Sequence, residues 1–348
     1  MSRASGTGSW PGTDVHLAVN AVRDLLGEDG LPYLPELPAR GPGGDMIGRA
    51  AGLLADLAVD LQPMGWRFVD RPGHDAHRTS GLLRQDLDEL AEAFDGYEGD
   101  LKLQIAGPWT LTSSIWLHRG ERSVVDAGAT RDVIASLAQG LRVHLDEVAR
   151  LVPKASLVVQ IDEPGLPAVL AGRLPTASGF GRLRAIDATT AAEGLRDVVA
   201  AAGDRHTVIH CCAADVPLVL LRDTGVSAVS VDIDLLSPRG WESLAATVES
   251  GVDLWAGVVP TAGTRERPGR EAGKRAGGRS QDLGQESVSA VIGPLVEAWS
   301  RVGLPLSELS RVTLTPACGL AGLTPSGARN VQRLAVDAAR ALSETAGG

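Results

Sequence analysis

The chain has 348 residues, of which 44% are hydrophobic and 22% charged, with a formal net charge of −10 at pH 7. This acidic balance argues against a nucleic-acid surface, which needs clustered positive charge, and no apolar run is long enough to span a membrane. Three cysteines are too few for a disulfide framework, and the first thirty residues hold no signal-peptide pattern, so we expect a cytoplasmic protein.

Short apolar runs recur along the chain, and a stretch with helical spacing of its apolar residues follows each of them. When the segment at 8–11 is counted as a strand, the pattern predicts eight strands. They lie at residues 8–11, 66–70, 101–107, 156–162, 207–212, 228–234, 253–259 and 312–318.

Capping residues mark the starts of several predicted helices. Asp14 and Asp45 precede periodic stretches at 15–26 and 46–61, and apolar spacing predicts a further helix at 129–151. Ser237-Pro238 and Thr324-Pro325 place an N-cap residue before a proline at the first helical position. The first pair predicts a helix at 238–249, and the second pair precedes a helical stretch at 331–342.

Eight strands alternating with helices predict a parallel sheet closed into a (β/α)8 TIM barrel, as a single domain over residues 1–348. Two stacked open-sheet domains are the alternative. The polar, glycine-rich segment 263–286 follows the seventh predicted strand and is nearly free of apolar residues. We expect it to be a mobile loop within the domain, either a tolerated insertion or a lid over the active face.

Side chains that bind metals fall at the carboxyl ends of several predicted strands, which meet at one rim of such a barrel. Residues two apart on a strand share a face, so His210 and Cys212 point one way and Cys211 the other. A third cysteine, Cys318, ends the last strand. Imidazole and thiolate donors together with a carboxylate suit zinc. Asp232 and Asp234, which share one face of the sixth predicted strand, are the carboxylates at this rim.

Each of these residues also has a plain structural interpretation. A lone cysteine is often a small buried hydrophobe. Asp232 or Asp234 could cap the next turn, and Asp162-Glu163-Pro164 could form a turn. The prediction therefore depends on all of these residues reaching the same rim.

Four motifs in the right order resemble the C-terminal catalytic barrel of cobalamin-independent methionine synthase, and the chain resembles its short single-barrel form. They are Gly8-Ser9-Trp10-Pro11, Gln160-Ile161-Asp162-Glu163-Pro164, His210-x-Cys212 and Pro316-Ala317-Cys318-Gly319-Leu320. The resemblance implies zinc held by His210, Cys212, Asp232 and Cys318.

The same resemblance implies an activity, which is zinc-dependent methyl transfer to the thiol of homocysteine to give methionine. Ser9 and Asp162, with Glu163 beside them, would bind the amino-acid substrate, and Asp162 and Asp232 would have catalytic roles. The methyl donor is either methyltetrahydrofolate or a methylcorrinoid. The family's strand-seven histidine has no counterpart in residues 255–260, which favours a corrinoid or corrinoid protein as partner. The alternatives are a methyltransferase for another small thiol and a non-catalytic relative that binds zinc or homocysteine.

Overall fold

The computed structural model describes residues 1–261 and 287–347. Within these residues, eight parallel strands form one sheet in the order β2-β1-β10-β9-β8-β7-β6-β5. The sheet curls until its two edges meet, where Lys102 N donates to Pro32 O at 2.8 Å and Leu34 N donates to Lys102 O at 3.1 Å. The predicted (β/α)8 barrel is therefore confirmed. Its strands are β1 (Arg3–Ser5), β2 (Gly30–Leu31), β5 (Asp100–Ala106), β6 (Ser156–Asp162), β7 (His206–Cys211), β8 (Ala228–Asp232), β9 (Asp253–Val259) and β10 (Thr313–Pro316).

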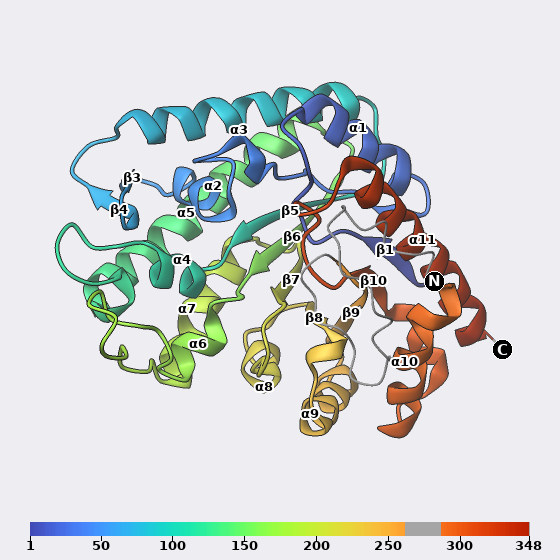
Figure 1. The fold of residues 1–348 in the computed structure, drawn as a ribbon. Helices are drawn as coiled ribbons and strands as arrows, with labels where there is room; N and C mark the ends of the chain where they lie inside the picture. Colours follow the sequence, from blue (N-terminus) through green and yellow to red (C-terminus); the bar gives the residue numbers. More distant parts are fainter. Residues whose placement is uncertain (262–286, 348) are drawn as a thin grey trace, which may run out of the picture.

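Helices cover the outside of the barrel, with α3 crossing one side and α1, α10 and α11 another (Figure 1). The α-helices are α1 (Val15–Leu26), α2 (Met46–Gly52), α3 (His74–Ala93), α4 (Pro108–Ser114), α5 (Ala127–Leu151), α6 (Leu166–Leu170), α7 (Ala188–Ala201), α8 (Leu218–Arg222), α9 (Pro238–Glu249), α10 (Val288–Arg301) and α11 (Pro325–Gly347). Short 3-10 turns are η1 (Pro38–Arg40), η2 (Ser123–Val125), η3 (Ile233–Leu235) and η4 (Leu306–Arg311).

The predicted capping residues begin their helices. Asp14 accepts a hydrogen bond from Leu17 N at 3.0 Å, Asp45 accepts one from Gly48 N at 2.8 Å, and Ser237 accepts one from Gly240 N at 3.1 Å. Each side chain satisfies an amide that the first turn of a helix leaves without a backbone partner. The starts of α1, α2 and α9 are therefore where the sequence predicts them.

The strand predicted at 66–70 does not belong to the barrel. Residues Gly65–Val69 form β4, which pairs with β3 (Ala58–Gln62) in a separate antiparallel hairpin. The helix predicted to reach residue 61 ends at Gly52, because the chain instead enters this hairpin. Pro63 lies in its turn, where a proline needs no ladder partner, and Gly65 takes up a φ of +119°.

The first two barrel strands also differ from the prediction. The first is β1 at Arg3–Ser5, and the segment 8–11 follows it as a loop at the carboxyl end of the barrel. The second is β2, which has only two residues. So short a strand carries no alternation of apolar and polar residues, which is the pattern that reveals a strand in a sequence.

Apolar side chains pack on both faces of the sheet. The large core lies between the strands and the helices and includes Ile209 of β7. A smaller cluster lies inside the barrel, made by Leu31, Val158, Val208, Ala228 and Trp255. Val208 and Ile209, which are neighbours on β7, thus face opposite sides of the sheet. The cluster inside the barrel forms an apolar floor, and the lumen above it is polar.

The two ends of the described chain meet beside β1. Ser2 N donates to Ser343 Oγ at 2.9 Å, and Ser2 Oγ donates to Leu309 O at 2.9 Å. Helix α11 therefore ends next to the start of the first strand, as Figure 1 shows.

The structure leaves the predictions for the loop and for the number of domains open. The loop expected at 263–286 lies outside the described residues, and the single-domain assignment stays a prediction. Among the described helices, none is long and apolar enough to cross a membrane.

Candidate active site

The carboxyl ends of β6, β7, β8 and β10 carry the predicted reactive residues. Asp162 at the end of β6 stands opposite His210 in the parallel pairing of β6 with β7. Cys212 follows β7, Asp232 ends β8, and Cys318 follows β10. The barrel thus gathers residues from distant parts of the sequence at one rim.

The two rim cysteines are in contact. The Sγ atoms of Cys212 and Cys318 lie 3.7 Å apart, although the residues are 106 positions apart in sequence. This distance excludes a disulfide, whose sulfurs lie about 2.0 Å apart. Two thiolates on one tetrahedral zinc, each with a Zn–S bond of about 2.3 Å, lie about 3.8 Å apart. The sulfur pair therefore has the spacing that such an ion requires.

Contact between the sulfurs changes the acidity of both thiols. The hydrogen bond from its neighbour lowers the pKa of Cys318, whereas the same contact raises the pKa of Cys212. Both residues are partly exposed. Cys211, in contrast, is buried and is not part of this pair, and burial raises the pKa of its thiol to about 12.

His210 lies inside the barrel with only one ring nitrogen in a hydrogen bond within the described residues. Its Nδ1 lies 2.9 Å from Ser230 Oγ on the neighbouring strand β8. Burial, and after it the positive charge of Lys102, lowers the pKa of the imidazole to about 3. A neutral ring oriented through one nitrogen is the form in which histidine binds metals through the other.

Of the two aspartates predicted on the sixth strand, Asp232 is buried and Asp234 is exposed. The Oδ1 atom of Asp232 accepts a hydrogen bond from Asp234 N at 3.0 Å. Asp232 also acts electrostatically on Cys318, where its negative charge opposes the fall of the pKa that Cys212 causes. Of these two aspartates, Asp232 is therefore the one that acts on the sulfur pair, and Asp234 lies in the turn η3.

The four predicted zinc ligands, His210, Cys212, Asp232 and Cys318, do not all lie close enough together to bind one ion. Among residues 1–261 and 287–347, no group of three or more His, Cys, Asp or Glu side chains is arranged closely enough to hold a metal ion. The donor types and the sulfur spacing fit zinc, and the ligation by His210 and Asp232 stays a prediction.

Ser9 lies on the same rim beside the turn that follows Cys318. Its carbonyl accepts a hydrogen bond from Leu320 N at 3.2 Å, and its Oγ accepts one from Ala321 N at 3.4 Å. A Cβ atom on Gly319 would lie 2.1 Å from Ser9 Oγ, so only glycine permits this close approach.

Asp162 is buried just below the rim. Its Oδ1 accepts a hydrogen bond from Gln160 Nε2 at 2.7 Å. Burial raises the pKa of its carboxyl group, and the neighbouring charge of Glu36 raises it further, whereas the Lys102 ammonium opposes this rise.

The carboxylate of Glu163 contacts the start of α4, whereas the sequence predicts a contact with substrate. Its Oε1 accepts from Trp109 N at 2.9 Å, and its Oε2 accepts from Thr110 N and Thr110 Oγ1, each at 2.8 Å. Both oxygens are thus engaged at the start of α4. Its contact with substrate stays a prediction, and its observed contacts hold this helix.

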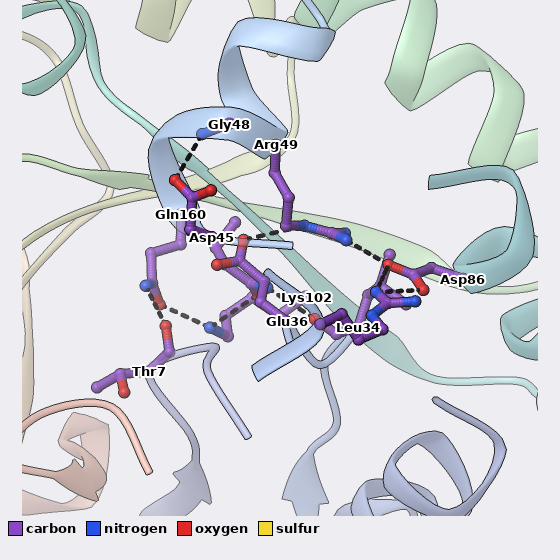
Figure 2. Close-up of polar contacts among 11 residues, drawn as sticks. Thr7, Leu34, Glu36, Asp45, Gly48, Arg49, Asp86, Lys102 and Gln160 are labelled. Carbon is purple, nitrogen blue, oxygen red and sulfur yellow. Dashed lines mark hydrogen bonds and ion pairs between the residues drawn. The ribbon is translucent and has the colours of Figure 1, made fainter. Parts of the chain in front are cut away.

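Sequence reasoning missed two buried charged residues of the lumen. Glu36 forms a parallel bridge with Ser9, and its carboxylate lies 3.6 Å from Arg49 (Figure 2). Lys102 is fully buried on β5. A lysine within the apolar run Leu101–Ala106 was a visible signal, whereas Glu36 lies in a segment with no periodic pattern.

Comparison with known proteins gives one family match. Residues 97–275, more than half of the chain, match the model of the cobalamin-independent synthase catalytic domain. This segment contains Asp162, His210, Cys212 and Asp232. No curated protein matches the sequence.

A solved structure of a B12-independent methionine synthase from Shewanella sp. W3-18-1, in complex with selenomethionine, is 12% identical with a TM-score of 0.47. The match covers 75% of this chain and 66% of that one, just under two thirds of its length. On the strength of the family match, the chain belongs to the cobalamin-independent synthase family, whose catalytic-domain model residues 97–275 match.

Proposed function

We propose that this protein is a zinc-dependent methyltransferase that transfers a methyl group to the thiol of homocysteine and forms methionine. The observation that carries the proposal is the 3.7 Å contact between the sulfurs of Cys212 and Cys318 at the rim of a barrel of this family. Two converging thiols are unusual donors for a hydrolytic site and suit a metal that activates another thiol.

The residues that would hold zinc are Cys212, Cys318, His210 through its Nε2 atom, and Asp232. Bound there, zinc would keep the substrate thiol deprotonated and nucleophilic near pH 7, where a free thiol with a pKa near 8.5 is mostly protonated. The contact between Ser230 and His210 Nδ1 would set the orientation of the ring.

The remaining rim residues would position the substrate. The Asp162 carboxylate suits the ammonium group of an amino acid, and the Ser9 hydroxyl lies beside the Cys318 turn, where it can hydrogen-bond the same end of the substrate. The buried floor of the barrel would keep water away from this end of the lumen.

Methyltetrahydrofolate is the donor that we propose. The corrinoid partner favoured by the missing strand-seven histidine finds no support, because the matching family is described as cobalamin-independent. All three cysteines are free thiols, which supports the predicted reducing, cytoplasmic location.

Metal content tests the proposal first. Purified under reducing conditions, the wild-type protein should hold one zinc per chain, and Cys212→Ser and Cys318→Ser should hold little. Cys211→Ser is the matched control and should keep its zinc, because Cys211 is buried apart from the sulfur pair. A zinc-free wild type, or equal loss in all three variants, would contradict the proposal and favour a non-catalytic relative.

Turnover of the zinc-loaded protein tests the reaction itself. We expect methionine from homocysteine and methyltetrahydrofolate, with methylcobalamin as the comparison donor. Faster methylation of a thiol that is not an amino acid would favour the alternative of another small-thiol substrate. A zinc-bound protein that uses neither donor would exclude the methyltransferase activity.

A further inference from the structure

Lys102 stands in the middle of the barrel lumen with no access to solvent. Its side chain is fully buried, on a strand whose other residues are mostly apolar. Its Nζ atom lies 2.7 Å from Gln160 Oε1 (Figure 2). The same atom lies 3.5 Å from Gln104 Oε1 and 5.0 Å from the centre of the Tyr33 ring. Burial lowers the pKa of Lys102 to about 7, and the charges of Asp162 and Glu36 oppose this fall. A buried ammonium group is costly, so its charge depends on these carboxylates and on its polar and aromatic partners.

The chemistry of these groups sets the direction of each hydrogen bond. An ammonium group only donates, so the oxygen of the Gln160 amide must face Lys102. The nitrogen of the same amide must then face the opposite way. There it donates to Thr7 O at 2.7 Å and to Asp162 Oδ1 at 2.7 Å. The Gln160 amide thus links Lys102 to the rim, with every polar atom in a defined role.

Gln160 consequently holds Asp162 through one carboxylate oxygen, Oδ1. Other charged groups of the lumen surround this pair. The carboxylates near Lys102 are those of Asp162 and Glu36, and both act electrostatically on its ammonium group. The carboxylate of Glu36 is also close to the Arg49 guanidinium. Lys102 and Asp162 therefore act electrostatically on each other, and the Gln160 amide hydrogen-bonds to both of them.

We propose that Lys102 and Gln160 act as positioning residues that fix the Asp162 carboxylate for the ammonium group of the substrate, and so make the site selective for amino acids over otherwise identical molecules without the amino group. The inference rests on the proposed function and names residues that set its substrate class. Neither Lys102 nor Gln160 needs to contact the substrate itself.

Binding of the reaction product tests the inference without methyl transfer and without a metal-binding thiol. Methionine and 4-(methylthio)butanoate differ only in the amino group. Isothermal titration calorimetry on the full chain should show that the wild type prefers methionine. Lys102→Met, which keeps the length and removes the charge, should weaken methionine binding about tenfold or more and leave 4-(methylthio)butanoate within about twofold.

Two further variants complete the experiment. Gln160→Leu should cause the same selective loss, and combining it with Lys102→Met should add little, because both break one chain of contacts. Lys154→Met is the matched control, since Lys154 is an exposed lysine that pairs only with Glu98 among the described residues. Far-UV circular dichroism identifies any variant that does not fold, and Gln160→Leu decides the matter if Lys102→Met fails.

Equal weakening of both ligands, or additive effects of the two substitutions, would overturn the positioning role while leaving the methyltransferase proposal intact. A wild type with no preference for methionine would overturn the inference together with its amino-acid substrate class. Methyl transfer, measured separately, decides the proposed function.

Discussion

Glu163 shows how a single buried carboxyl group can make stability depend on pH. Burial raises its pKa from 4.5 to about 7, although three hydrogen bonds from Trp109 and Thr110 oppose the rise. Between these two pH values the folded protein keeps a proton that the unfolded chain has released. The contribution of Glu163 to stability is therefore full below pH 4.5, falls as the pH rises toward 7, and is constant above it.

Replacing Glu163 with glutamine should remove this pH dependence. The wild type should lose on the order of 3 kcal/mol more than Glu163→Gln between pH 4.5 and pH 8. Urea unfolding at several pH values measures the difference, with Glu242→Gln on an exposed position of α9 as control. Parallel profiles for the wild type and Glu163→Gln would show that Glu163 has an ordinary pKa.

Alternation along a strand accounts for the residues that the sequence predicted well. It separated Cys212, which contacts Cys318, from Cys211, which is buried elsewhere. Periodicity says nothing about loops, so the place of Glu36 next to Ser9 became visible only with the fold. Glu163 follows Asp162 directly in sequence, and its carboxylate contacts α4. Alternation along the strand already predicts that it faces away from the side of Asp162.

At the scale of elements, a buried ionic cluster joins α2 to α3. Asp86 of α3 is completely buried and contacts Arg49 of α2, and Arg40 donates to it at 2.7 Å (Figure 2). Arg49 also lies 3.6 Å from the carboxylate of Glu36 near the candidate site. The cluster therefore connects the packing of two helices with the charge balance of the lumen.

Asp86→Asn should destabilise the protein by about 3–5 kcal/mol, because it leaves two buried guanidinium groups without their shared countercharge. Asp88→Asn on an exposed position of the same helix is the control, and we expect it to change stability by less than about 0.5 kcal/mol. Chemical denaturation followed by far-UV circular dichroism measures both. A loss below about 1 kcal/mol for Asp86→Asn would mean that Arg40 and Arg49 find other partners.

Helix starts were predictable because a cap is a local feature of a few residues, as Asp14 and Ser237 show. The strands from β5 to β10 were predictable because each is an apolar run of sufficient length. The two-residue strand β2 was not, because its place depends on β1 and β5 rather than on its own composition. The assignment of residues 66–70 to the barrel was wrong because the residues of a separate hairpin, β3–β4, also favour a strand.

At the scale of the whole molecule, strand β5 is paired unequally on its two sides among the described residues, and its weak seam faces β2. Strands β5 and β6 pair along the whole of Asp100–Ala106. Between β2 and β5 the parallel contact consists of a bridge at Tyr33 and Lys102. Opening at this seam breaks fewer hydrogen bonds than opening between β5 and β6, so it costs less free energy.

Hydrogen exchange should therefore be fastest at this seam among the barrel contacts of β5. We expect the Leu34 amide to exchange at least about tenfold faster than the amides that join β5 to β6, measured by mass spectrometry or NMR under native conditions. Comparison within one sample controls for solution conditions. Equal protection on both sides of β5 would show that the barrel opens only as a unit.

The contact between Ser2 and Ser343 also has a practical consequence for handling the protein. Helix α11 starts near Ser9 on the rim and runs down the barrel to the start of β1. Both ends of the described chain therefore lie at the edge opposite Cys212 and Cys318. An affinity tag, a fluorescent label or a surface anchor attached at either end would leave the reactive sulfurs open to solution. Immobilised protein could then be exposed in turn to metals, thiols and methyl donors.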